Sequence, residues 1–341
     1  MGTTLRVGIA GAGLMGYWHA AASRAAGGSV TAVVDRDPDA AGRLARNHPG
    51  ASSFTSLEEM LGNEVVDVLH VCTNTDSHHE IALAAIQAGA HVLVEKPMAA
   101  TAADSEDLIV EAGAHGVSVC PVHQFLFQDG VRAAHVALPM IGDLVHLQAT
   151  FCTAGAEGLP DETADRLIAD ILPHPLSLAQ FFLPAALPER WTTLRSVAGE
   201  LRASCATAGT TLSFVISTHG RPTLCAFDVV GSAGSIHLDL YHGYAVIEPG
   251  AVSRARKLAR PFAHAMRTAT AATFNSGRRL WRGEAAYPGL WQLVDAFYGS
   301  IRSHGPAPIP AHEAIEIAHL RDRLAEDAGL LDRNIALGRT A

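Results

Sequence analysis

Three glycines near the N-terminus, Gly11, Gly13 and Gly16, constrain the fold of this chain more than any other feature. They stand in the run GAGLMG, between an apolar segment with the pattern of a strand (5–11) and a segment with the pattern of a helix (12–26). At such a junction the first glycine allows a tight turn, the second lets a pyrophosphate approach the backbone, and the third lets the helix pack on the strand. The motif therefore predicts a βαβ unit that binds a dinucleotide.

The alternation of strand and helix patterns continues through the first third of the chain. Strand-like runs at 29–35, 65–73 and 91–95 alternate with helical runs at 37–47 and 78–89. Strands separated by helices of this length are typical of an α/β domain with a parallel sheet. We therefore expect residues 1–122 to form a doubly wound Rossmann domain that binds the dinucleotide.

Beyond about residue 122 the pattern changes to short strand-like runs joined by Gly, Ser or Pro turns. The run VVGSAGSI (229–236) predicts a β-hairpin. Helical stretches at 167–183 and 311–331 are expected to cover one face of a single antiparallel sheet. Residues 123–341 are thus expected to form a second domain of the α+β class.

Composition and charge exclude several classes of protein. A chain of 341 residues with 48% hydrophobic and 17% charged residues has enough apolar surface for two folded cores. A formal net charge of −9 argues against nucleic acid as the partner. There is no apolar run of about 18 residues and no signal-peptide pattern, so we expect a soluble, cytoplasmic protein without a membrane partner. Five cysteines without a CxxC pair indicate reduced thiols, and we expect no metal site.

Asp35 indicates which dinucleotide is preferred. It ends the second predicted strand, about 20 residues after the last glycine of the motif, where an acid that binds the ribose belongs. Its carboxylate would repel the 2′-phosphate of NADP, so NAD is the expected cofactor. The neighbouring Arg36 could soften this preference, which leaves NADP possible.

The run HVLVEKP delivers Glu95, Lys96 and Pro97 to the carboxyl end of a predicted strand. Ligands of open α/β sheets lie at that edge. The only other lysine of the chain is Lys257, so positive charge is otherwise supplied by arginine. An ammonium is a compact charge whose pKa moves on burial, and proline restrains the residue before it. Lys96 is therefore a candidate for chemistry.

Several of these motifs together resemble the Gfo/Idh/MocA family. They are GAGLMG with His19, Asp35, the run CTNTDSHHEIALAAIQAGAHVLVEKPMA (72–99), VVGSAGSIHLDL (229–240) and PIPAHEAIEIAHLRDRL (308–324). The resemblance implies a Rossmann domain followed by a substrate-binding α+β domain with an open, mostly antiparallel sheet. It also implies a homodimer or homotetramer formed through that sheet, and a contact between Lys96 and the substrate hydroxyl that is oxidised.

The resemblance extends to the residues of the site. It places the cofactor against Gly11, Gly13, Leu14, Met15, Gly16, Asp35, Arg36, Thr73, Asn74, His78, Glu95, Lys96 and Gln124. Its second catalytic signature is an aspartate followed four residues later by a histidine, here Asp170 and His174. A neutral imidazole suits removal of the hydroxyl proton as the hydride leaves, with the aspartate orienting the ring.

The chain departs from the family pattern at several positions. Leu172 and Ser177 replace a usual glycine and carboxylate, and Pro173 and Pro175 flank the histidine, so a continuous helix through Asp170 and His174 is not assured. The run 124–127 lacks an arginine that relatives often carry, which suggests that a substrate contact is missing. The run TNT (73–75) replaces the usual Thr-Pro.

The segment 251–283 is peculiar to this chain. It has no acid and eight basic residues: Arg254, Arg256, Lys257, Arg260, Arg267, Arg278, Arg279 and Arg282. Leu258, Phe262 and Met266 recur every four residues, which predicts an amphipathic helix with a basic face. Such a helix could recognise phosphate or an acidic partner, form a subunit contact, present a solvated face or lie on a membrane.

The motifs together predict an NAD(P)-dependent dehydrogenase or reductase. It would transfer a hydride between a nicotinamide and a secondary alcohol or ketone of a sugar, a cyclic polyol or a sugar-like substrate, including phosphorylated or nucleotide-activated ones. Two alternatives stay open. The same residues could support a redox-neutral epimerase or glycosidase that oxidises its substrate transiently. The chain could also be a non-catalytic regulator that responds to the dinucleotide.

Overall fold

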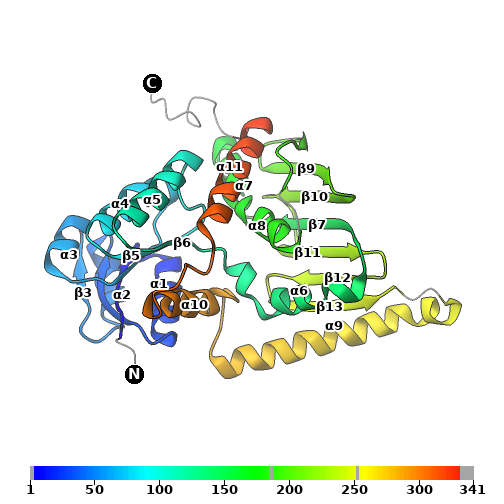
Figure 1. The fold of residues 1–341 in the computed structure, drawn as a ribbon, viewed down its shortest axis with the longest axis horizontal. Helices are drawn as coiled ribbons and strands as arrows, with labels where there is room; N and C mark the ends of the chain where they lie inside the picture. The colour runs from blue at the N-terminus through cyan, green and yellow to red at the C-terminus, as the bar shows by residue number, and fades with distance from the viewer. Residues whose placement is uncertain (1–3, 184–186, 251–252, 331–341) are drawn as a thin grey trace. The chain divides into compact units, whose positions relative to one another are not determined.

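The computed structural model describes residues 4–183, 187–250 and 253–330 (Figure 1). They group into two compact units. The first comprises Met1–His123 and Leu290–His319, and the second comprises Gln124–Gly289 and Leu320–Ala341.

The first unit is built on a six-stranded parallel sheet in the order β3-β2-β1-β4-β5-β6. Its strands are β1 (Arg6–Ala10), β2 (Ser29–Val34), β3 (Ser52–Phe54), β4 (Val68–Val71), β5 (His91–Val94) and β6 (Val119–Pro121). Its main helices are α1 (Leu14–Ala25), α2 (Pro38–Ala45), α3 (Leu57–Asn63), α4 (His78–Gln87), α5 (Ala102–Ala114) and α10 (Leu290–Arg302), with the short helix η1 (Thr75–Ser77). The chain order reverses between β1 and β4, which confirms the predicted doubly wound Rossmann sheet and its switch point.

One segment of the first unit was expected in the second domain. Helix α10 packs against α1, and Tyr298 is fully buried there with its hydroxyl donating to Ser23 Oγ at 3.0 Å. Residues 290–319 therefore belong with the Rossmann sheet and not with the domain expected over 123–341. The reason is tertiary, because the apolar face of α10 covers a helix more than 260 residues earlier in the chain.

The second unit has a seven-stranded sheet in the order β13-β12-β11-β7-β10-β9-β8. Its strands are β7 (Leu144–Cys152), β8 (Thr192–Leu194), β9 (Glu200–Thr207), β10 (Thr210–Ser217), β11 (Leu224–Gly231), β12 (Gly234–Asp239) and β13 (Tyr244–Pro249). All neighbours are antiparallel except β10 and β7, which run parallel. The predicted hairpin is confirmed, since β11 and β12 pair from Val230 and Ser235 outward.

Helices α6 (Asp129–Ile141), α7 (Asp161–Ile171) and α8 (Pro173–Phe182) lie on one face of this sheet, and η2 (Gln124–Phe127) begins the unit (Figure 1). The long helix α9 (Arg254–Arg282) runs beside the edge strand β13 and confirms the helix predicted over the basic segment, whose residues 251–252 lie outside the described part. The last described helix is α11 (Ala311–Asp327); Leu331, its expected end, lies outside the described residues.

The single helical stretch expected at 167–183 is two helices that meet at Leu172. Leu172 keeps helical dihedral angles (φ −49°, ψ −38°), so the path is nearly continuous. Pro173 has no N–H to offer the carbonyl of Ala169 four residues earlier. The buried Arg321 lies at that carbonyl instead, with Nε donating to Ala169 O at 3.4 Å.

None of the helices within the described ranges combines the length and the apolar character needed to cross a lipid bilayer.

Candidate active site

The glycine motif forms a turn that leaves no room for side chains at two of its three positions. Gly11 has φ +94°, and a Cβ there would lie 2.7 Å from the carbonyl oxygen of Cys72. A Cβ on Gly16 would lie 1.9 Å from the oxygen of Gly11, so the helix could not pack so close. Gly13 instead faces open space, with nothing within 4 Å, and is the N-cap of α1. No acid occupies the first turn of α1, which suits the approach of an anion to its N–H groups.

The carboxylate of Asp35 is held beside this turn by two backbone groups. Ala12 N–H donates to Oδ2 at 2.7 Å, and Asp37 N–H donates to Oδ1 at 2.9 Å. Each carboxylate oxygen keeps a second acceptor position. Asp35 thus fixes the conformation of the glycine turn and can still accept from a ribose hydroxyl.

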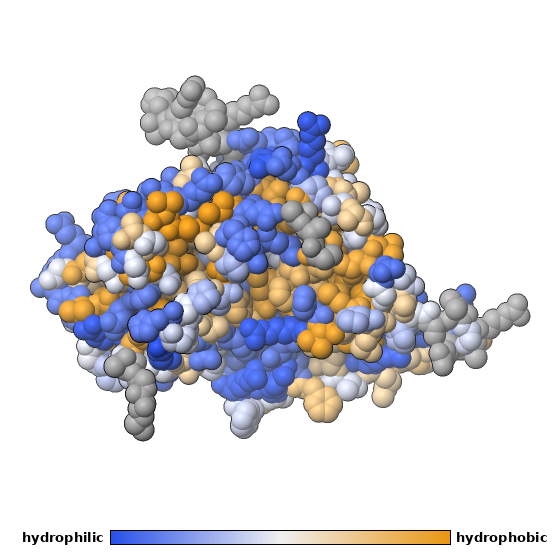
Figure 2. Space-filling model, viewed as in Figure 1, coloured by the Kyte–Doolittle hydropathy of each residue, from blue (hydrophilic) through white to orange (hydrophobic). Residues whose placement is uncertain are grey.

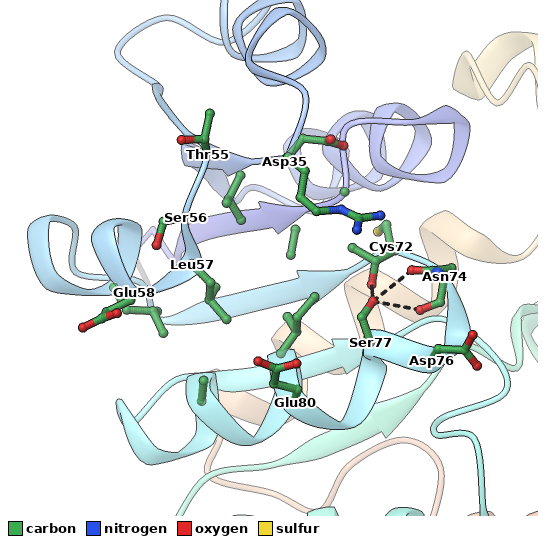
Figure 3. A pocket seen from close by; sticks show the side chains of 18 of the residues that line it. Asp35, Thr55, Ser56, Leu57, Glu58, Cys72, Asn74, Asp76, Ser77 and Glu80 are labelled. Atoms are coloured by element: carbon green, nitrogen blue, oxygen red, sulfur yellow. Dashed lines mark hydrogen bonds between the residues drawn. The ribbon is translucent and has the colours of Figure 1, made fainter. Parts of the chain in front are cut away.

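A cavity of about 1190 Å³ opens at this edge of the sheet (Figure 3). Of the expected cofactor residues it is lined by Gly11, Gly13, Asp35, Arg36, Thr73 and Asn74. The rest of the lining was not predicted. It comes from the loop after β3, from α3 and from α4, through Thr55, Ser56, Leu57, Glu58, Leu61, Glu80, Ile81 and Ala84. Leu57, Leu61 and Ile81 give this part of the lining an apolar surface suited to a flat base such as adenine. The apolar periodicity of the run SLEEML was the one signal that could have identified it.

The charge of the cavity lining is predominantly negative. Asp35, Glu58, Asp76 and Glu80 line it, against the single base Arg36. A 2′-phosphate would add negative charge to this surface, whereas a 2′-hydroxyl would not.

The loop after β4 is ordered by Ser77 and His78. The hydroxyl of Ser77 lies 2.9 Å from Thr73 Oγ1 and 3.1 Å from Asn74 Oδ1, contacts that orient both side chains at the cavity (Figure 3). His78 is buried, and its ring spans Pro97 O at 2.8 Å and Thr73 O at 3.1 Å. His78 therefore joins the loop after β4 to the loop after β5 and is not among the cavity residues.

Lys96 lies directly after β5, half-buried, as the sequence predicts. Its backbone N–H donates to Oε2 of Glu95 at 3.1 Å. Glu95 is buried, and its other oxygen lies 3.0 Å from Nε2 of His19. The side chain that precedes Lys96 is thus turned back into the domain, where it fixes the backbone of Lys96.

A chain of buried hydrogen bonds continues from Glu95 into the interior, and its protons can be assigned. The Tyr298 hydroxyl donates to Ser23 Oγ at 3.0 Å, and Ser23 donates to the backbone oxygen of His19 at 2.7 Å. Because the Tyr298 proton is used, Nε2 of His70 must donate to the phenol oxygen, 2.8 Å away. Burial and the charge of His19 lower the pKa of His70 well below its usual range, so His70 has one N–H only. Its Nδ1 therefore accepts.

The next proton follows from this arrangement. Nδ1 of His19 lies 2.8 Å from Nδ1 of His70 and must donate to it. Burial raises the pKa of Glu95, but the hydrogen bond and charge of His19, with the charge and N–H of Lys96, lower it below its ordinary value of 4.5. Nε2 of His19 lies 3.0 Å from the carboxylate of Glu95, so the two side chains form a buried, hydrogen-bonded pair beneath Lys96.

His123 is a further residue near Lys96 that the sequence did not reveal. It follows β6, whose Pro121 is in register with Val94 of β5. Burial and the charge of Lys96 lower the pKa of His123 to about 4. Its Nδ1 has no hydrogen-bond partner among the residues that the structure describes. A neutral imidazole thus stands close to the ammonium, and the position of His123 after a strand was the only sequence signal.

The two catalytic candidates of the second unit lie on the α7–α8 path. Asp170 belongs to α7 and forms an ion pair with the buried Arg321, 3.8 Å from its guanidinium. His174 belongs to α8, is 8% exposed and packs between Phe125, with ring centroids 4.4 Å apart, and Phe151, at 6.2 Å and 1° between planes. Helical geometry at Leu172 places positions 170 and 174 on one face.

Three other expected cofactor residues have varied positions. Leu14 is 66% exposed at the start of α1, and Met15 beside it is half-buried. Gln124 is buried in η2, at the start of the second unit, and its Oε1 has no hydrogen-bond partner within the described part of the chain.

Fold and site together define the first unit as a Rossmann domain with a site suited to a dinucleotide. Residues 5–123 match the family GFO_IDH_MocA, described as an oxidoreductase family with an NAD-binding Rossmann fold. This match, which spans the strands of the Rossmann sheet, agrees with the resemblance that the sequence showed.

Relatives of known activity support this assignment. The 1,5-anhydro-D-fructose reductase of Ensifer adhaerens is 30% identical over 176 residues, which cover 49% of this chain and 52% of that protein. The chain thus spans about half the length of this relative. The inositol 2-dehydrogenase of Acidothermus cellulolyticus is 27% identical over 340 residues, covering 88% and 93%. A solved levoglucosan dehydrogenase, in complex with NADH and levoglucosan, has the same fold, with a TM-score of 0.76, 17% identity and coverage of 96% and 98%.

Proposed function

We propose that this protein is an NAD-dependent dehydrogenase or reductase that acts on a secondary alcohol or ketone of a sugar or cyclic polyol. The observation that carries the proposal is the placement of Lys96. It follows β5 at the carboxyl edge of the sheet that also holds the glycine turn and Asp35, and a buried ion pair fixes its backbone.

The proposed substrate class rests on the similarity of this chain to enzymes that act on sugars and polyols, and on the polar side chains proposed for the site. The relatives named above are described by their activity on anhydrofructose and inositol, and the levoglucosan enzyme was solved with a sugar derivative. Polyhydroxylated rings need several hydrogen-bonding groups around one reacting carbon. Lys96, Asp170 and His174 supply charged and neutral polar groups of this kind.

Bound NAD would supply the carbon that accepts or returns the hydride. The side chains of this protein would handle the proton and the oxygen. We assign to Lys96 the stabilisation of the alkoxide that develops on the substrate, because an ammonium is a fixed positive donor. We assign to His174 the acceptance of the hydroxyl proton, with Asp170 favouring its charged form.

NAD is preferred to NADP in this proposal. Four carboxylates and one guanidinium line the cavity, and Asp35 is anchored where the ribose hydroxyls would lie. Arg36 alone does not reverse that balance.

The proposed function is tested by following NADH absorbance during incubation with NAD and a panel of inositols, anhydrosugars and aldoses, and in reverse with the matching ketones. Net reduction of NAD by a polyol or sugar, absent in Lys96→Met, is the expected result. Product formation without any net change in NADH would favour a redox-neutral epimerase or glycosidase. Tight NAD binding with no conversion of any substrate would favour a regulator.

We also propose a cytoplasmic enzyme that forms a homodimer or homotetramer through the open face of the second unit's sheet. All five cysteines are free thiols, which is consistent with a reducing compartment. The mass of the purified protein in solution tests the oligomeric state.

A further inference from the structure

Helix α9 packs on its own unit through its polar face and turns its apolar face outward. The inner face is fixed by ion pairs, because Arg260 Nη2 lies 2.9 Å from Glu248 Oε2, and Arg278 and Arg282 each lie 2.8 Å from Asp129 Oδ2. Asn275 is buried on the same face. This arrangement is the reverse of an ordinary amphipathic surface helix, whose apolar stripe faces the core.

The outward face carries six large apolar side chains. They are Leu258, Phe262, Met266, Phe274, Leu280 and Trp281, with exposed fractions between 68% and 87%. Figure 2 shows apolar side chains projecting where Figure 1 draws α9. Monomeric soluble proteins rarely leave a continuous apolar surface of this extent in water.

This face, hereafter the α9 outer face, is also uncharged. At about 100° per residue the six side chains fall within an arc of about 160°. From Lys257 onward that arc contains otherwise only alanine, serine, threonine and glycine, and the lysine and arginine residues lie on the remaining arc. A partner selected by charge, such as an acidic peptide, would therefore find nothing to recognise here. An anionic lipid surface is also disfavoured, because Arg260, Arg278 and Arg282 are engaged with carboxylates of their own unit.

The area matches what a stable pair of identical subunits requires. Aromatic side chains bury about 150 to 250 Å² each. With about 150 Å² for each of the six side chains, three of which are aromatic, and with their exposed fractions, the face offers on the order of 700 Å² per copy. A standard interface takes about 800 Å² from each partner. The α9 outer face approaches this value only if it is covered along most of its length of about 43 Å.

The sequence of α9 is self-complementary in the antiparallel direction. A two-fold axis beside Ala269 places Phe262 opposite Gly277 of the second copy, and Leu280 opposite Ala259. Phe262, Leu280 and Met266, which lies opposite Thr273, then face small residues, as close helix packing needs. Leu258 and Trp281 face each other at both ends of the pair and form an apolar contact there. Two-fold pairing makes each such contact twice.

We propose that the α9 outer face binds the α9 outer face of a second copy of this chain, as an antiparallel two-fold pair. The inference is independent of the catalytic activity. It adds a self-association surface to the one proposed on the sheet, so that two such surfaces together would give a tetramer.

The first test is the mass of the full chain, measured by light scattering after size exclusion. Phe262→Glu and Leu280→Glu should each halve the mass at a concentration where the unmodified protein is associated, because each places two like charges in the interface. The dissociation constant should rise about a hundredfold or more. Val136→Glu is the matched control, since Val136 is equally exposed on α6 and should leave the mass unchanged. The proposal is overturned if the unmodified protein is monomeric at all concentrations. It is also overturned if the mass falls equally in all three variants, or in none of them.

The second test reads the register and does not depend on weakening the pair. Ala269→Cys lies beside the axis and should form a covalent dimer under mild oxidation. Ser276→Cys on the same face should not, because its copy would lie about 20 Å away. The unmodified chain, with its five native cysteines, is the blank. Equal cross-linking of the two variants overturns the two-fold register. Sedimentation with vesicles of phosphatidylserine and phosphatidylcholine, lost in Phe262→Glu at unchanged mass, identifies a lipid surface and overturns the proposal.

Discussion

Replacing His19 by alanine should convert Glu95 from a stabilising carboxylate into a destabilising one, with a distinctive dependence on pH. In the unmodified protein the pKa of Glu95 lies below 4.5 because of His19 and Lys96, although burial acts in the opposite direction. The Glu95 carboxylate therefore contributes stability at pH values above 4.5, and this contribution is lost as the pH falls through the lowered pKa of Glu95. In the variant the hydrogen bond and charge of His19 are gone, and we expect burial, the largest single influence on Glu95, to outweigh Lys96 and raise the pKa of Glu95 above 4.5. Its protonated form then stabilises the fold at low pH, and that contribution is lost as the pH rises.

The magnitude follows from the geometry of the pair. His19 is fully buried and the Glu95 side chain is 10% exposed, so removing one partner should cost about 3 to 5 kcal/mol at neutral pH. The variant can avoid a buried charge by protonating Glu95. For a carboxyl group with an ordinary pKa of 4.5, this costs about 0.7 kcal/mol at pH 5 and about 3.4 kcal/mol at pH 7. The difference in free energy of unfolding between the unmodified protein and His19→Ala, called the gap below, should therefore narrow by about 2 to 3 kcal/mol between pH 7 and pH 5.

Urea unfolding at the two pH values measures this gap. The double variant His19→Ala with Glu95→Gln is the matched control, because it keeps the cavity but has no carboxyl group to titrate. Both variants lack His19, so the difference between their free energies of unfolding isolates Glu95, and this difference should change by about 2 to 3 kcal/mol between pH 7 and pH 5. If the single variant shows the same gap at both pH values, Glu95 is not left as an unpaired buried charge, and the proton assignment of the buried chain is wrong.

Three further predictions concern the site. Lys96→Met should lower turnover by about a hundredfold to a thousandfold and change NAD affinity by no more than a few-fold, since the proposed role of the ammonium is on the substrate oxygen and not on the cofactor. If more than a tenth of the turnover remains, Lys96 has no part in the mechanism. Asp35→Ser should lower the ratio of kcat/KM with NAD to kcat/KM with NADP. It should also weaken NAD binding, because Ala12 N–H loses its acceptor. Equal kcat/KM values with both cofactors in the unmodified enzyme would contradict the argument. His174→Ala should remove a rise of the oxidation rate with pH near neutrality and cost about a hundredfold to ten-thousandfold. A rise of the oxidation rate near pH 4 would instead reflect His123, whose pKa is about 4. If the rise near neutral pH persists in His174→Ala but is absent in Lys96→Met, the lysine is the base.

Residues close together in the chain determined much of this protein. The glycine turn, Asp35, the strand before Lys96, the β11–β12 hairpin and the amphipathic α9 are all local patterns. In each, the spacing of glycine, apolar and charged residues is the physical cause of the structure. Local sequence therefore predicted the fold class and the dinucleotide edge of the sheet.

Tertiary packing decided what the sequence left open. Tyr298 joins His70 in the Rossmann unit across 228 positions, and only that contact fixes which nitrogen of His70 carries the proton. Arg321 reaches the carbonyl that Pro173 leaves without a donor, and the backbone stays helical at Leu172 between Asp170 and His174. The outward direction of Phe262 was equally hidden, because periodicity shows that a helix has two faces but not which one meets the body. Asp129 and Glu248, far apart in the chain, hold the basic face inward, and the apolar face is exposed as a result.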